Sequence, residues 1–189
     1  MRYCASMEDK DLIKLLFNLS TREEGFNLIV EKYSKRLYWT IRRMVVSHDD
    51  ADDVMQETFI KFWTTLDRFK GQSSVYTWLY RIAVNSAINF LKARQKYHAV
   101  DVDSSEYFRK LTANDSLYSG DDIERALQIA IAKLPIKQRT VFMLRYYDEM
   151  SYADMSKVLD TSEGALKASY HIAAEKIEKE VKLSLIEIV

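Results

Sequence analysis

Amide, cationic and aromatic side chains recur at helical spacing in the segment "SSVYTWLYRIAVNSAINFLKARQK". At about 100° per residue they fall on one narrow strip of a helix: Trp78, Arg81, Asn85, Asn89, Lys92 and Lys96. Amides can hydrogen-bond to base edges, cations can bind phosphates, and an indole can stack on an unpaired base. The strip therefore predicts nucleic-acid binding, although an amphipathic helix with a solvated edge shows the same pattern.

The segment before this helix, "RFKGQSS", has the composition of a tight polar loop. Gly71 permits a sharp turn of the backbone. Short polar groups surround that glycine: Lys70, Gln72, Ser73 and Ser74. A loop of this kind can hold a base that has left the duplex. We therefore expect residues 69–74, beginning with Phe69, to act together with the strip.

The segment "DDADDVMQETFIKFWTTL", residues 49–66, predicts a helix with two unlike faces. The side expected in the core carries Ala51, Val54, Met55, Thr58, Phe62 and Leu66. The other side carries Asp49, Asp52, Asp53, Gln56, Ile60 and Trp63. Aspartates complement a helix N-terminus, but this does not explain an exposed Trp and Ile. Carboxylates beside apolar anchors repel phosphate and suit a protein partner, so this face predicts a protein-binding surface.

The segment "SEGALKASYHIAAEKI", residues 162–177, has the spacing of a helix that could enter a DNA groove. Leu166, Tyr170, Ala173 and Ile177 share one face and are expected to pack on the preceding helix. The outward face carries Gly164, Lys167, Ala168, His171 and Glu175. Ser162 as N-cap leaves backbone N–H groups free for a phosphate. A helical hairpin that only mediates dimerisation is the alternative interpretation.

These faces require a chain built from helices. One proline and four glycines in 189 residues are too few for the turns of an all-β protein, so the composition predicts an all-α fold. Ser20 to Glu23 resembles a capping box, and Asp49 and Ser74 are expected as N-caps. The predicted helices run toward Met44 from that box and over residues 49–66, 74–94, 122–132, 136–147, 151–159 and 162–180. The last two form a helix-turn-helix.

Residues 98–121 break the helical periodicity and gather Asp, Ser, Asn and Gly. They predict a flexible linker, with one short helical turn near residues 106–111, between two small helical domains at residues 1–97 and 122–189. Lys and Arg against Asp and Glu number 16 to 12 in the first domain, 2 to 5 in the linker and 10 to 11 in the second domain. With a net charge of zero, the chain is expected to bind free DNA weakly.

Several classes of site have no basis in the sequence. The chain has no run of about 20 apolar residues and no signal-peptide core, so we expect a cytoplasmic protein without membrane insertion. Cys4 is the single cysteine, and His48, His98 and His171 lack metal-ligand spacing. No Ser/His/Asp set or phosphate loop occurs. We expect no metal, no cofactor and no enzymatic activity.

Two blocks of sequence resemble a bacterial RNA polymerase sigma factor of the sigma-70 family, extracytoplasmic-function (ECF) type. "DADDVMQETFIKFW" and "LDRFKGQSSVYTWLYRIAVNSAINFLK" are similar to sigma domain two, with its acid-rich helix, Gln-Glu pair and F-x-G loop. "LPIKQRTVFMLRYYDEMSYADMSKVLDTSEGALKASYHIAAEKI" is similar to sigma domain four with its helix-turn-helix. The order and spacing of the two blocks match the family over nearly the whole chain.

The resemblance implies a role for each surface. Core RNA polymerase is expected to bind Asp52, Asp53, Gln56, Glu57, Ile60 and Trp63. The minus-ten promoter element is expected to meet Phe69, Lys70, Gly71, Gln72, Ser73, Ser74, Trp78, Arg81, Asn85, Lys92 and Lys96. The minus-thirty-five element is expected to meet Ser162, Glu163, Gly164, Lys167, Ala168 and His171. An anti-sigma factor is a further expected partner.

The implied mechanism is recruitment of polymerase followed by promoter melting, in which domain two captures an unstacked base. Two other functions remain open from the residues alone. A two-domain transcriptional regulator would share the helix-turn-helix and bind promoters without polymerase. A helical adaptor without a nucleic-acid role would fit the neutral charge but leaves the Trp78–Lys96 strip unexplained.

Overall fold

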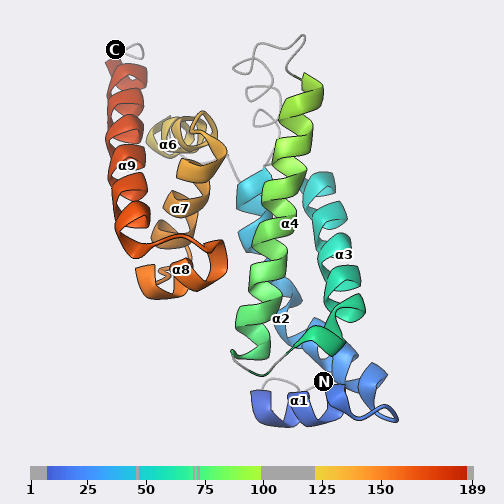
Figure 1. Ribbon diagram of the computed structural model, residues 1–189. Coiled ribbons are helices and arrows are strands. Elements are labelled where there is room, and N and C mark those ends of the chain that lie inside the picture. The colour runs from blue at the N-terminus through green and yellow to red at the C-terminus, as the bar shows by residue number, and fades with distance from the viewer. Residues whose placement is uncertain (1–7, 46, 70, 72, 99–121, 187–189) are drawn as a thin grey trace.

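The computed structural model describes residues 8–45, 47–69, 71, 73–98 and 122–186, and over these residues the fold is all-α (Figure 1). No β-strand occurs in the described part, which confirms the predicted class. The elements in chain order are α1 (Asp9–Phe17), α2 (Arg22–Val45), α3 (His48–Thr64), the short 3-10 helix η2 (Leu66–Arg68), α4 (Val75–His98), α6 (Asp122–Ala132), α7 (Ile136–Tyr146), α8 (Tyr152–Leu159) and α9 (Glu163–Ile186).

Serine side chains cap several of these helices. Ser74 Oγ accepts from the backbone N–H of Thr77 at 3.0 Å, as predicted for α4. Ser162 Oγ accepts from the N–H of Ala165 at 3.4 Å at the start of α9. The predicted cap of α3 is wrong: Ser47 is its N-cap, and Asp49 lies in its first turn. Each cap satisfies one of the orphan N–H groups of a helix start.

The first turn of α2 differs from the predicted capping box, because the N–H and the hydroxyl of Ser20 both donate to Asn18 Oδ1, at 3.1 and 2.8 Å. The Thr21 hydroxyl donates to the backbone oxygen of Leu15 at 3.0 Å, so it binds back to α1. Helix α1 itself was not predicted. It approaches α2 so closely that a Cβ on Gly25 would lie 2.7 Å from the backbone nitrogen of Leu16. A glycine is therefore required where these two helices meet.

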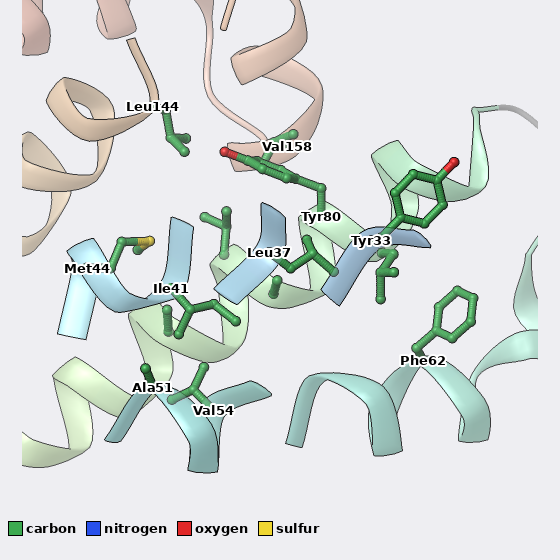
Figure 2. Packing of buried hydrophobic residues seen from close by; sticks show 14 of the residues in the cluster. Tyr33, Leu37, Ile41, Met44, Ala51, Val54, Phe62, Tyr80, Leu144 and Val158 are labelled. Carbon is green, nitrogen blue, oxygen red and sulfur yellow. The ribbon is translucent and has the colours of Figure 1, made fainter. Parts of the chain in front are cut away.

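Helices α2, α3 and α4 pack around one apolar core (Figures 1 and 2). The predicted inner face of α3 is confirmed, since Ala51, Val54, Thr58 and Phe62 are fully or almost fully buried. Leu79 and Ala83 of α4 complete this core from the other side. Burial of apolar area at about 25 cal/mol per Å² is the main stabilisation of such a layer.

The second group of helices, α6 to α9, carries the helix-turn-helix. Asp160 takes a left-handed backbone conformation, with φ 51°, and ends α8 before α9 begins. The predicted inner face of α9 is confirmed, since Leu166, Ala173 and Ile177 are buried. Its packing partner is broader than expected: Ala173 and Ile177 pack with residues of α6 and α7.

The two groups of helices are packed against each other, which the sequence did not predict. Helix α7 lies against α2, and α8 lies against α4 (Figure 1). Leu144 of α7 and Val158 of α8 belong to the same buried cluster as Leu37, Ile41 and Tyr80 (Figure 2). The predicted linker after His98, and its short turn at residues 106–111, lie outside the described residues.

Candidate nucleic-acid interface

Three donors of the strip on α4 have no partner among the residues that the structure describes. Arg81, Asn85 and Lys92 are exposed, and none of the hydrogen bonds or ion pairs found among the described residues involves them. Asn89 and Lys96 are exposed on the same helix. An exposed amide between two cations can bind a base edge while the cations bind phosphates.

Trp78 differs from the other members of the strip because it is half-buried. Its ring centroid lies 5.1 Å from that of Phe62 and 5.1 Å from that of Phe69. Phe69 also stacks on Phe17 of α1, at 5.8 Å. The indole therefore packs against Phe69 at the start of the loop, and only its exposed part is open to a base.

Aromatic rings form a continuous series from α3 to this loop. Trp63 contacts Phe26 at 5.0 Å in a T-shaped arrangement, and Phe26 stacks on Phe62 at 6.1 Å. Phe62 in turn contacts Trp78. Ring pairs of this geometry add about 0.5–1.5 kcal/mol each beyond area burial. The series makes a rigid support for the start of the loop at Phe69.

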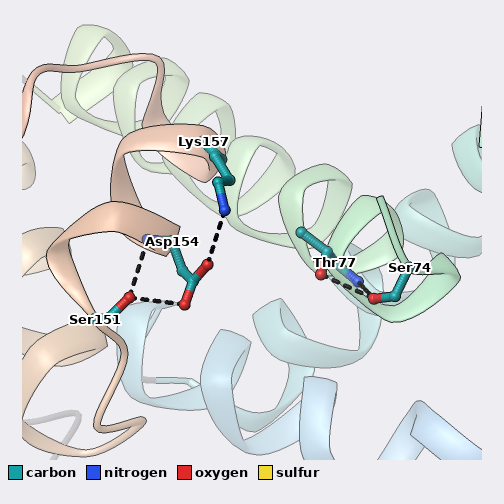
Figure 3. Close-up of polar contacts among 5 residues, drawn as sticks. All are labelled: Ser74, Thr77, Ser151, Asp154 and Lys157. Carbon is teal, nitrogen blue, oxygen red and sulfur yellow. Dashed lines mark hydrogen bonds and ion pairs between the residues drawn. The ribbon is translucent and has the colours of Figure 1, made fainter. Parts of the chain in front are cut away.

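The loop has the backbone predicted from its glycine. Gly71 has φ +69°, a left-handed conformation that favours glycine, and a Cβ there would meet no other atom within 4 Å. Ser73 and Ser74 are exposed, and the Ser74 hydroxyl also bonds to that of Thr77 (Figure 3). Lys70 and Gln72, which we predicted as DNA contacts, lie outside the described residues.

The acidic-aromatic face of α3 is exposed as predicted. Ile60 is 59% and Trp63 is 41% exposed, a high fraction for large apolar side chains. Four exposed polar side chains precede them on the same helix: Asp52, Asp53, Gln56 and Glu57. Glu57 pairs with Lys61 at 2.5 Å, and Asp52 Oδ2 lies 3.7 Å from His48 Nε2. Exposed apolar side chains beside charged ones are typical of protein interfaces.

The outward face of α9 is exposed from its first residue. Six predicted contacts lie on this surface: Ser162, Glu163, Gly164, Lys167, Ala168 and His171. The Lys167 ammonium lies 5.7 Å from the centroid of the Tyr152 ring, at the start of α8. His171 Nε2 lies 3.3 Å from Glu175 Oε1, so this acid competes with any acceptor for the imidazole.

Helix α8 is held at its start by local polar contacts. The Ser151 hydroxyl donates to Asp154 at 2.7 Å and accepts from the Asp154 N–H at 3.1 Å (Figure 3). Lys157 pairs with the same carboxylate at 3.3 Å. These bonds lower the pKa of Asp154 below its ordinary value, the Ser151 contact contributing most. The first helix of the helix-turn-helix is thus well defined.

Two tyrosines of α4 lie close to the contact between the two groups of helices. Burial raises the pKa of Tyr76 to about 12. Burial, followed by the nearby Asp148 carboxylate, also raises the pKa of Tyr80 well above its ordinary value. Tyr80 donates a hydrogen bond to Asp148. Sequence reasoning missed Asp148, because nothing in its local pattern "YYDEM" indicates a distant partner.

Metal sites and membrane-spanning helices are both absent from the described residues. No cluster of His, Cys, Asp and Glu side chains suited to a metal ion occurs among them. None of the described helices is long and apolar enough to cross a membrane.

Family models match both groups of helices. A model for Sigma-70 region 2 matches residues 29–97, and one for Sigma-70, region 4 matches residues 124–177. The first match contains the α3 face, the loop and the strip on α4. The second contains the helix-turn-helix and most of α9.

Curated relatives match across both regions. The chain is 31% identical over 169 residues to the ECF RNA polymerase sigma-E factor of Haemophilus influenzae, covering 85% of this chain and 89% of that protein. It is 34% identical over 166 residues to the RNA polymerase sigma-H factor of Pseudomonas aeruginosa, covering 83% and 86%. The ECF sigma-E factor of Escherichia coli is 32% identical over 169 residues, covering 85% and 88%.

Solved structures share the fold. CnrH, solved in complex with the cytosolic domain of CnrY, matches with a TM-score of 0.65 at 21% identity, covering 93% of this chain and 97% of that one. The sigma factor RpoE of Bartonella quintana, solved with the anti-sigma factor NepR, matches with a TM-score of 0.63 at 21% identity, covering 85% and 96%. Together with the two regions and the curated relatives, these likenesses show that the chain belongs to the ECF group of the sigma-70 family of RNA polymerase sigma factors.

Proposed function

We propose that this sigma factor works through three separate surfaces of its described helices, one for core RNA polymerase and two for promoter DNA. As a member of its family, the chain directs core RNA polymerase to specific promoters and is not an enzyme. The residues that make each contact are our assignment. It rests on which side chains are exposed together and on what chemistry they offer.

Core polymerase binds the α3 face in this proposal. Ile60 and Trp63 are the apolar anchors, and the polar rim before them on the helix sets the orientation of the partner. The rim consists of Asp52, Asp53, Gln56 and Glu57. Its carboxylates keep DNA phosphates away from this side of the molecule, so the surface selects protein over nucleic acid.

The minus-ten element binds the loop and the strip on α4. Asn85 reads a base edge, while Arg81, Lys92 and Lys96 hold the backbone on either side. The loop from Phe69 to Ser74 encloses a base that has left the stack. The ring series that ends at Phe69 and Trp78 keeps the first residue of the loop in place before DNA arrives, which reduces the ordering cost of binding.

The minus-thirty-five element binds the start of α9. Ser162, Glu163 and Gly164 present backbone N–H groups to a phosphate. Lys167 reaches a guanine or a phosphate, Ala168 meets a thymine methyl group, and His171 donates to an acceptor. With so few cations, affinity must come from tethering on polymerase, which gives an effective concentration of about millimolar.

The remaining assignments concern the organisation of the whole chain. We assign residues 1–97 to domain two, 98–121 to a flexible linker and 122–189 to domain four. The chain acts in the cytoplasm, where the polymerase is. An anti-sigma factor is its regulator, a proposal supported by the sigma factor RpoE of the same fold, which was solved with the anti-sigma factor NepR.

The observation that carries the site assignment is the exposed strip of Arg81, Asn85 and Lys92 beside a glycine loop that is supported by aromatic rings. The test adds the purified chain to core polymerase and sequences the transcripts made from fragmented genomic DNA. We expect new start sites that share two upstream motifs and that are absent with core polymerase alone. Retention of promoter DNA by the chain without polymerase, and no new start site, would instead identify a two-domain regulator.

A further inference from the structure

Ile172 is a large apolar side chain of α9 that the proposed contacts leave without a role. It is 42% exposed, whereas Leu166, Ala173 and Ile177 of the same helix are buried. Helix α9 lies at one edge of the molecule, and the helices that contact it, α6, α7 and α8, lie to one side of it (Figure 1). Packing within the described residues therefore does not explain an isoleucine at this position.

Ile172 lies beside the residues of α9 that we assign to the minus-thirty-five element. At about 100° per residue it is one turn beyond Ala168 and on the same side of the helix. Both side chains are exposed. The helix rises about 6 Å between them, which corresponds to about two base pairs at 3.4 Å each. Because the major groove is about 12 Å wide, a helix that places Ala168 in the groove places Ile172 there as well.

The charged side chains one turn beyond Ile172 are paired with other residues of the protein. Glu175 Oε1 lies 3.3 Å from His171 Nε2. Lys176 Nζ donates to Gln138 Oε1 of α7 at 3.0 Å. The apolar surface of Ile172 is thus the group that α9 presents to a base at this point. Base pairs present hydrogen-bond donors and acceptors in the major groove, and thymine alone adds a methyl group.

We propose that Ile172 is a specificity-determining residue, which selects thymine at one position of the minus-thirty-five element through contact with the thymine methyl group. This inference rests on the proposed placement of α9 in the major groove. Removing one methyl group from water corresponds to about a fourfold preference. Cytosine and guanine at the same position would leave a polar group facing a side chain that cannot form a hydrogen bond, which lowers binding further.

The first test measures the base preference of the full chain on core polymerase. The minus-thirty-five element of a promoter found by transcript sequencing is randomised, and each template carries a transcribed barcode. We expect the parent to favour thymine at one position and Ile172→Ala to lose that preference. Ile172→Arg should favour guanine at the same position, because an arginine binds guanine O6 and N7 together.

Leu183→Ala is the matched control for Ile172→Ala. Leu183 is 50% exposed on the same helix, about three turns further on and outside the assigned contacts, so its loss removes a similar apolar surface. We expect this variant to keep the base preferences of the parent. Circular dichroism should show the same helicity in the parent and in all three variants.

The second test removes the methyl group from the DNA instead of from the protein. Deoxyuridine replaces thymidine at the selected position and keeps every hydrogen-bonding group of the base. At a subsaturating concentration of the chain, we expect transcription by the parent to fall about fourfold. Ile172→Ala should transcribe both templates equally. A direct contact predicts this non-additivity between the two deletions.

Two results would overturn the inference. One is the absence of a thymine preference in the parent. The other is an equal loss by Ile172→Ala on the thymine and uracil templates, which would indicate that Ile172 contacts a protein. Lys167→Ala distinguishes this failure from that of the proposed function: if it lowers transcription from the parental element while Ile172→Ala has no base-dependent effect, only the inference fails. If neither Lys167→Ala nor randomisation of the element changes transcription, the placement of α9 on DNA fails as well.

Discussion

At the residue scale, Asn85 is the amide that our proposal places against a base. Asn85→Ala removes the hydrogen-bonding groups while preserving the helix, since alanine is the best helix former. We expect loss of open complexes, concentrated at one promoter position and costing about 1–3 kcal/mol of discrimination. The measurement is a scan of promoter variants with both proteins. Asn27→Ala, an exposed amide on α2, is the control. The same base preferences in variant and parent would remove Asn85 from the site.

Tyr76 leads to a second prediction at this scale. Its hydroxyl is buried and has no hydrogen-bond partner among the described residues, and burial raises its pKa to about 12. A buried unsatisfied hydroxyl costs about 1–3 kcal/mol. We expect Tyr76→Phe to raise the free energy of unfolding by about 1 kcal/mol in denaturant titrations. Tyr146→Phe, on an exposed tyrosine, should leave it unchanged. A loss of stability in Tyr76→Phe would show that the hydroxyl has a partner.

At the scale of single elements, α3 presents the proposed polymerase-binding face. Combining Asp53→Ala with Gln56→Lys raises the charge of that face without touching its buried side. We expect this pair to abolish co-purification with core polymerase, because a repulsive charge at an interface rim can cost several kcal/mol. Circular dichroism should show unchanged helicity. Glu31→Lys on α2 makes the same total change in charge and should still co-purify.

Gly25 tests the contact between α1 and α2. A Cβ there would lie 2.7 Å from the backbone nitrogen of Leu16, which cannot move away as a side chain can. We expect Gly25→Ala to lower the free energy of unfolding by about 1–3 kcal/mol. At Gly164 nothing lies within 4 Å of an added Cβ. Gly164→Ala should therefore raise stability, by up to about 1 kcal/mol. Thermal melts of both variants show whether close packing or helix propensity determines the change in stability at each glycine.

At the scale of the whole molecule, the net charge of zero limits DNA binding by the free chain. The logarithm of the binding constant falls with the logarithm of salt concentration, by about 0.9 per phosphate neutralised. We expect weak binding to duplex promoter DNA with a slope no steeper than about −3. Fluorescence anisotropy over a salt series measures this slope. Tight binding with a steep slope would show that the chain does not depend on polymerase for its affinity.

Local pattern accounts for much of what the structure contains. The period of apolar residues in α3 and α9 predicted their buried faces, because side chains three and four residues apart share one side of a helix. Ser74 and Ser162 were predicted as caps for a similarly local reason: a serine oxygen binds an N–H within its own first turn. The exposed strip on α4 and the exposed face of α3 follow from the same period. All of these depend on residues within a few turns of each other.

The tertiary structure decided which helices meet. The close approach of α1 at Gly25, the ring series that half-buries Trp78, and the contact of Asp148 with Tyr80 and Thr40 each join residues far apart in the chain. Periodicity shows that a face is apolar but not which partner covers it, because that choice depends on shape and on summed burial over the whole surface. The sequence by itself therefore determined the α-helices from α2 onward, the faces of α3, α4 and α9, and the family, whereas helix α1 and the packing of region 4 on region 2 became visible only in three dimensions.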